Sequence, residues 1–194
     1  MVICEKQEEL NDESVDIVIK KPVIRKDHPA VVKAKDLDIS VINEMEVAYQ
    51  FIPKDVTVYW NYWIQWKNYN YNNYLWTFGI FEFQCFLGGN IGIPLSSIVN
   101  EIQSKDLLVL EISDHQLCDM YDFKTNVSAL TNLSEVHIDF HGTYEQYKNT
   151  KKKIFNHNTN EDIAILNKEN KDILELTNEQ WNSFIRFNSS YEVS

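Results

Sequence analysis

The chain has 194 residues, 44% of them hydrophobic, so it can bury a sizeable core, and global disorder is excluded. Its formal net charge of −11 and isoelectric point near 4.9 argue against nucleic acids and anionic membranes as partners, because phosphate groups require cationic side chains. The same charge favours association with a basic protein. We expect one globular domain over residues 1–194, with residues 1–14 irregular.

The number and spacing of the cysteines indicate the redox environment of the protein. Cys4, Cys85 and Cys118 are widely spaced, and no CxxC or Cys/His finger spacing occurs. A zinc finger is therefore excluded, and the sparse cysteines fit a reducing environment. The first residues lack the basic and apolar regions of a signal peptide, and no apolar run approaches membrane-spanning length. We therefore expect a cytoplasmic protein.

The first elements expected in chain order are strands. Residues 15–19 (VDIVI) form a short apolar run that is typical of a strand. Residues 30–51 are ambiguous, because Leu37, Ile39 and Val41 alternate as in a strand while the following residues also fit a helix. We favour a strand for this segment.

Residues 56–87 hold most of the aromatic side chains and give the clearest strand signal. Every second residue from Val56 to Trp66 is apolar, which is the period of a half-buried strand. A second strand is expected at residues 75–87, after an asparagine-rich connection. We expect a long β-hairpin whose rings mainly fill a core.

The remaining elements complete an α+β pattern. Residues 106–112 (DLLVLEI) are apolar on both faces, which indicates an interior strand. Helices are expected at residues 94–102 and from Thr177, where a capping box precedes Phe184 and Ile185. Further strands are expected at residues 135–141, 162–166 and 172–176. The sequence therefore predicts an α+β fold, a mainly antiparallel sheet of about six to eight strands with two short packed helices.

His137, Asp139 and His141 are the most chemically suggestive group. On a strand they would share one face, and a curved strand could direct two of them to a metal ion. His115 or His157 could then supply a further ligand. This spacing allows a metal-dependent hydrolase as an alternative, although a solvated polar face explains it more simply.

Motifs for covalent or phosphate chemistry are missing. The sequence has neither GxSxG nor SxxK, and the acidic neighbours of Cys118 would raise its pKa despite the nearby His115. Gly88-Gly89-Asn90 with Gly92 lacks the lysine of a P-loop and is better explained as a turn. We therefore expect no catalytic residue, no metal and no cofactor, and a protein that is not an enzyme.

The acidic residues lead to the favoured functional hypothesis. An acidic surface patch is expected from Glu111, Asp114, Asp119, Asp122, Glu135 and Asp139, with Tyr69 and Tyr71 as further partner-binding residues. In size and charge the chain resembles the small acidic immunity proteins that neutralise toxins, which implies a non-catalytic cytosolic inhibitor that binds a basic toxin or effector. The alternative is a carbohydrate-binding module that uses Tyr59, Trp63, Tyr69 and Tyr71.

Overall fold

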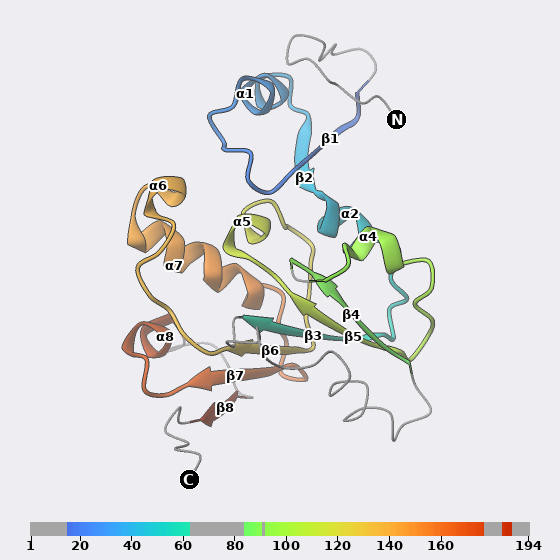
Figure 1. The fold of residues 1–194 in the computed structure, drawn as a ribbon, viewed down its shortest axis with the longest axis vertical. Helices are drawn as coiled ribbons and strands as arrows, with labels where there is room; N and C mark the ends of the chain where they lie inside the picture. The colour runs from blue at the N-terminus through green and yellow to red at the C-terminus, as the bar shows by residue number, and fades with distance from the viewer. Residues whose placement is uncertain (1–14, 63–83, 91, 177–183, 188–194) are drawn as a thin grey trace.

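The centre of the fold is a six-stranded sheet whose strands all run parallel (Figure 1). The computed structural model describes residues 15–62, 84–90, 92–176 and 184–187. The strand order is β4-β5-β3-β6-β7-β8, and each neighbouring pair is parallel. The strands are β3 (Thr57–Tyr62), β4 (Cys85–Gly89), β5 (Leu107–Glu111), β6 (Val127–Leu130), β7 (Ile163–Asn167) and β8 (Phe184–Phe187). The expected mainly antiparallel sheet is therefore wrong.

The aromatic segment does not form a hairpin. β5 lies between β3 and β4 and pairs in parallel register with both, which places Trp60 beside Leu110 and Leu87 beside Val109. A period of two identifies a strand but not the direction of its neighbours. The run at residues 106–112, apolar on both faces, is typical of an interior strand, and β5 occupies such an interior position. Residues 63–83 lie outside the described part of the chain.

Short helices connect the strands of the sheet. They are α4 (Leu95–Ile98), α5 (Asp114–Leu117), α6 (Ile138–His141), α7 (Tyr144–Lys152), the 3-10 turn η3 (Lys153–Phe155) and α8 (Lys171–Leu176). α5 and α7 lie side by side above the sheet (Figure 1). The helix expected after Pro94 is confirmed by α4.

The main core fills the space between the sheet, α5 and α7. Trp60 is 1% exposed, and its ring meets Phe155 edge to face with centroids 6.4 Å apart. Tyr147 and Ile154 belong to the same buried cluster, so the inner face of α7 and η3 is apolar. Lys151 lies one turn after Tyr147 on this face and is also fully buried, which makes it the exception that needs a chemical reason.

A smaller unit precedes the sheet. It consists of a parallel strand pair, β1 (Ile17–Lys20) and β2 (Ser40–Asn43), joined through α1 (Pro29–Asp36), and it is followed by α2 (Glu44–Tyr49). The expected strand at residues 15–19 is confirmed, whereas most of residues 30–51 is helical. Pro29 at the first helical turn and the His28 cap, whose Nδ1 accepts from Ala30 N at 3.3 Å, explain the start of α1.

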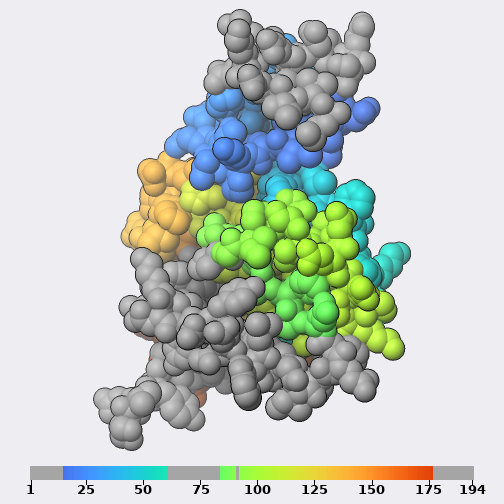
Figure 2. Space-filling view, turned by 45° about the vertical axis from the view of Figure 1, so that its right-hand side comes forward, coloured from blue at the N-terminus to red at the C-terminus, as the bar shows by residue number. Residues whose placement is uncertain are grey.

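Buried polar contacts join this unit to the segment after β5. The Lys20 ammonium lies 2.5 Å from Asp119 Oδ2, and Asn43 Nδ2 donates to Gln116 O at 2.5 Å. Figure 2 shows the unit adjoining the body of the molecule. Among the described residues, no helix is both long enough and apolar enough to cross a membrane.

The carboxyl-terminal half holds three more corrections. Residues 138–141 form the short helix α6 instead of a strand, and residues 171–176 form α8 where a strand was expected at 172–176. Phe184 and Ile185 lie on β8, although the sequence placed them on a helix. In such short segments the few apolar residues fit the period of a helix as well as that of a strand, and tertiary packing decides which of the two forms.

Candidate functional site

A cluster of charged side chains lies at the carboxyl edge of the sheet. In parallel sheets, ligands bind where the connections of adjacent strands leave in opposite directions. β3 and β5 are such neighbours, because the chain runs from β3 to β4 on one side and from β5 past β3 to β6 on the other. Glu111 ends β5 and Asp114 follows it, so both lie at this crevice position.

The turn after β4 borders the same place. Asn90 N donates to Glu111 O at 2.8 Å. Gly89 has a φ of 107°, and a Cβ there would collide with Glu111 O, so glycine is required beside this strand end. The Gly88-Gly89-Asn90 segment is thus explained by a turn and a close backbone approach.

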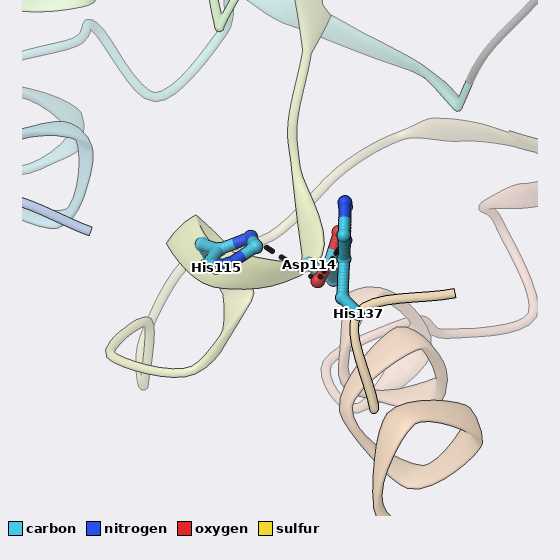
Figure 3. A group of neighbouring side chains, drawn as sticks. All are labelled: Asp114, His115 and His137. Carbon is cyan, nitrogen blue, oxygen red and sulfur yellow. Dashed lines mark hydrogen bonds and ion pairs between the residues drawn. The ribbon is translucent and has the colours of Figure 1, made fainter. Parts of the chain in front are cut away.

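Asp114 is the centre of the cluster. Asp114 is 1% exposed, and basic side chains from three parts of the chain approach its carboxylate. Figure 3 shows two of these side chains, His115 and His137. Its Oδ2 lies 2.7 Å from His141 Nε2, 3.0 Å from His137 Nδ1 and 3.2 Å from His115 Nδ1. Lys151 Nζ lies 3.8 Å from its Oδ1. We call Glu111, Asp114, His115, His137, His141 and Lys151 the Asp114 cluster.

Local sequence signals position these side chains. Ser113 and Gln116 form a capping box, which fixes Asp114 in the first turn of α5. His137 precedes α6 with φ 53° and ψ 32°, a left-handed conformation that is uncommon outside glycine, and Gly142 with φ 87° ends that helix after His141. Thr143 then caps α7, accepting from Gln146 N at 3.2 Å.

Burial and charge compete at each titratable group. Burial alone would raise the pKa of Asp114, but the charge of Lys151 and hydrogen bonds from His141 and His137 outweigh it, so that pKa is lowered. Burial lowers the pKa of Lys151 to about 7, despite the opposing charges of Asp114 and Glu111. Burial also raises the pKa of Glu111 and lowers that of His115. The cluster therefore combines an ionised carboxylate with a buried lysine whose pKa lies near neutral pH.

The residues selected from the sequence divide into three groups. Glu111 and Asp114 meet in the cluster, whereas the buried Asp119 pairs with Lys20. Asp122, Glu135 and Asp139 are exposed. Tyr69 and Tyr71 lie outside the described residues, as does Trp63. The six acidic residues therefore do not make one solvent-facing patch, because Asp114 and Asp119 point inward.

The histidines were partly anticipated. His137 and His141 do act together, but they converge on Asp114 of a different element, while Asp139 is exposed and its backbone carbonyl accepts from Arg25 Nη1 at 2.5 Å. Lys151 was missed. A signal was present, because it occupies an apolar helix face between Tyr147 and Ile154, where a lysine is costly without a partner.

Comparison with known proteins gives a consistent result. The Mur ligase middle domain matches residues 57–193. The UDP-N-acetylmuramoylalanine–D-glutamate ligase of Clostridium kluyveri is 36% identical over 173 residues, which cover 87% of this chain and 36% of the relative. The enzyme of the same name from Clostridium novyi is 33% identical over 194 residues, covering 94% and 39%. The chain thus spans little more than a third of the length of these curated relatives.

Solved structures agree on the fold. The MurF ligase of Thermotoga maritima, solved with ADP, aligns with a TM-score of 0.54 at 19% identity and covers 93% of this chain and 50% of its own. The UDP-N-acetylmuramate:L-alanyl-gamma-D-glutamyl-meso-diaminopimelate ligase of Neisseria meningitides aligns with a TM-score of 0.58 at 13% identity, covering 89% and 58%.

These matches correct the functional expectations. The relatives are ligases, so the hypotheses of a non-enzymatic immunity-type inhibitor with a basic protein partner, of a carbohydrate-binding module and of a metal-dependent hydrolase are wrong. The chain belongs to the Mur ligase family, whose middle domain it matches over most of its length.

Proposed function

We propose that this chain serves as the middle-domain part of a ligase that joins D-glutamate to UDP-N-acetylmuramoylalanine, the reaction in the names of its relatives. The partners would then be small molecules: the nucleotide-linked sugar acid, an amino acid and an adenine nucleotide, as the ADP in the Thermotoga structure suggests. A cytoplasmic location fits the free thiols of Cys85 and Cys118.

The observation that carries the proposal is the Asp114 cluster at the switch point of a parallel sheet. A reaction between a carboxylate and an amine, coupled to a nucleotide, gathers several anionic groups at one place. The amine of Lys151 and the imidazole nitrogens offer N–H donors to such groups, and the carboxylates of Asp114 and Glu111 can hold a cation that accompanies phosphates. Among the described residues Glu111 Oε2 is buried without a hydrogen-bond partner, which suits an atom that awaits a ligand.

The nucleotide phosphates require a separate account. No G-x-x-x-x-G-K-[S/T] sequence occurs among the 194 residues. A glycine-rich phosphate loop of that form therefore cannot be assigned to this chain, and the phosphates would be bound by other groups.

Calorimetric titration tests the proposal directly. Purified protein is titrated with UDP-N-acetylmuramoylalanine and, separately, with Mg²⁺-ADP, and we expect saturable binding of the sugar acid. Lys151→Met should weaken that binding at least about tenfold, since a charge-assisted contact contributes about 1.5–3 kcal/mol. Lys152→Met is the matched control, because Lys152 is the next residue of α7 and is exposed.

Two outcomes would contradict the proposal. One is a protein that binds neither the sugar acid nor the nucleotide. The other is equal binding by the Lys151→Met and Lys152→Met proteins, which would remove the cluster from the site.

A further inference from the structure

We propose that a cavity between the small amino-terminal unit and the segment after α5 binds an aliphatic amine, that is, ammonium groups carried on methylene chains. The cavity has a volume of about 580 Å³, and its lining comes from β1, α1, β2, α2 and the residues Tyr121 and Asp122. Pockets for small molecules commonly measure about 300–1,000 Å³. The inference does not depend on the proposed ligase activity, because the lining contains no member of the Asp114 cluster.

Glu46, in the first turn of α2, gives the cavity its clearest chemical signal. Its side chain lines the cavity although the residue is only 3% exposed. Its Oε1 accepts from Asp122 N at 2.6 Å, and its backbone N donates to Asn43 Oδ1 at 3.0 Å. Its Oε2 is buried and has no hydrogen-bond partner among the described residues. Buried polar atoms are nearly always hydrogen-bonded, so this oxygen points to a donor that a ligand supplies.

The charge of the lining indicates that the ligand is a cation. The described residues of the lining include three carboxylates, of Asp38, Glu46 and Asp122, and one lysine, Lys35. Asp38, Asp122 and Lys35 are exposed, so the cavity is accessible from solvent. An excess of negative charge attracts a positively charged ligand. Among the described residues, these three carboxylates do not lie close enough together to hold one metal ion, so an organic cation fits the charge better.

The apolar part of the lining indicates that the cation carries methylene groups. This part consists of side chains of the parallel strand pair and its approach, Ile17, Ile39, Val41 and Ile42. Ile17 is 43% exposed, and a ligand that covers it removes apolar surface from water. A hydrated inorganic ion gains nothing from such a contact. Carboxylates beside aliphatic side chains therefore match an aliphatic amine.

Tyr121 adds an aromatic surface to the cavity. Its ring belongs to a residue that is 54% exposed, and the faces of tyrosine rings attract alkylammonium groups. Lys153 Nζ lies 5.5 Å from the centroid of this ring. That ammonium donates to Leu117 O at 3.2 Å and to Cys118 O at 2.8 Å, so two of its hydrogens are directed to the backbone and not to the Glu46 carboxylate.

Calorimetric titration of the full chain with spermidine tests the site. We expect one equivalent to bind saturably at physiological salt. Glu46→Gln keeps an oxygen that accepts from Asp122 N but removes the charge, and it should weaken binding at least about tenfold, since charge-assisted hydrogen bonds are the strong ones. Glu101→Gln removes the same charge from an exposed position outside the lining and should bind as the parent does.

A change of the opposite sign separates binding from poor folding. Lys35→Gln removes the lysine of the lining, so spermidine should bind about two- to fivefold more tightly, as expected for one exposed charge. Lys33→Gln is the matched control, because Lys33 is an exposed residue of the same helix and does not line the cavity. A variant that merely folds poorly cannot produce a gain in affinity.

Isoleucine methyl NMR locates the bound amine. Spermidine should shift the methyl resonances of Ile17 and Ile42 and leave that of Ile112, which is buried in the main core, in place. Three results would overturn the site. They are the absence of saturable binding, displacement of spermidine by an equal concentration of Mg²⁺, and equal weakening by Glu46→Gln and Glu101→Gln, which would mean attraction to the acidic surface as a whole.

Discussion

Two buried aspartates five residues apart, Asp114 and Asp119, differ in the number of their basic partners and in how close a lysine lies. Asp119 has one close ion-pair partner, Lys20, at 2.5 Å, and that ammonium also donates to Ile24 O at 2.8 Å. Asp114 is contacted by three imidazoles, with Lys151 further away at 3.8 Å. The first arrangement matches one charge with one charge and ties β1 to the segment after β5. The second gathers four basic nitrogens around one carboxylate and lowers its pKa, and groups with perturbed pKa values are typical of functional sites.

The largest effect is expected at the matched pair. Lys20→Met leaves the Asp119 carboxylate buried without its cation, so the free energy of unfolding should fall by about 3–5 kcal/mol. Urea denaturation followed by circular dichroism measures the change. Lys21→Met is the control, since Lys21 is the exposed next residue and should change stability by less than about 0.5 kcal/mol. Equal stabilities for the two variants would refute the structural role of the pair.

Removal of the other lysine should cost less. In Lys151→Met, Asp114 keeps its contacts to three imidazoles, so its carboxylate is not left without partners. We expect a loss of about 1–3 kcal/mol in the same urea measurement. A loss as large as that of Lys20→Met would mean that Lys151 and Asp114 form a second matched pair, and the contrast between the regions would disappear.

A third aspartate, Asp162, also has a lysine partner, and its replacement should change stability less. Burial would raise the pKa of Asp162, but hydrogen bonds from Thr159 and the ammonium of Lys124, 2.9 Å from Oδ2, outweigh it and lower that pKa. The unfolded chain therefore binds the proton first as pH falls, so this stabilisation is present at neutral pH and is lost as pH falls through the folded-state pKa.

Asp162→Asn should accordingly lower stability at pH 7 by about 1–2 kcal/mol and converge with the parent protein in acid. Thermal unfolding from pH 7 down to acid pH measures the difference. A stability gap between the two proteins that stays constant, or widens in acid, would show that the carboxylate charge is not the cause.

Much of the sheet could be read from the sequence, but not its direction. β1, β5 and α4 were predicted at nearly their observed positions, because each has a strong local pattern. Strand alternation carries no information on whether a neighbour is parallel. The residues apolar on both faces at 106–112 were the one local sign of a parallel sheet, and that sign applies to an interior strand of either kind.

The candidate site was harder to predict from the sequence than the sheet, because it joins side chains that are far apart along the chain. His137 and His141 stood out by type, yet they meet Asp114, which is more than 20 residues away, only because α6 is helical. A strand would have separated them and paired them with Asp139. Lys151 had a readable signal as a charge on an apolar helix face, whereas its partner depends on how α7 packs against α5.

The most direct test of the contrast between the two aspartates is the affinity for UDP-N-acetylmuramoylalanine of two matched variants, Asp114→Asn and Asp119→Asn, measured by calorimetric titration of the folded fraction of each. We predict that Asp119→Asn binds the sugar acid with the affinity of the parent protein, and that Asp114→Asn loses at least about tenfold, since a charge-assisted contact contributes about 1.5–3 kcal/mol. Equal affinities in the two variants would contradict the assignment of Asp114 to a ligand site and of Asp119 to the structure.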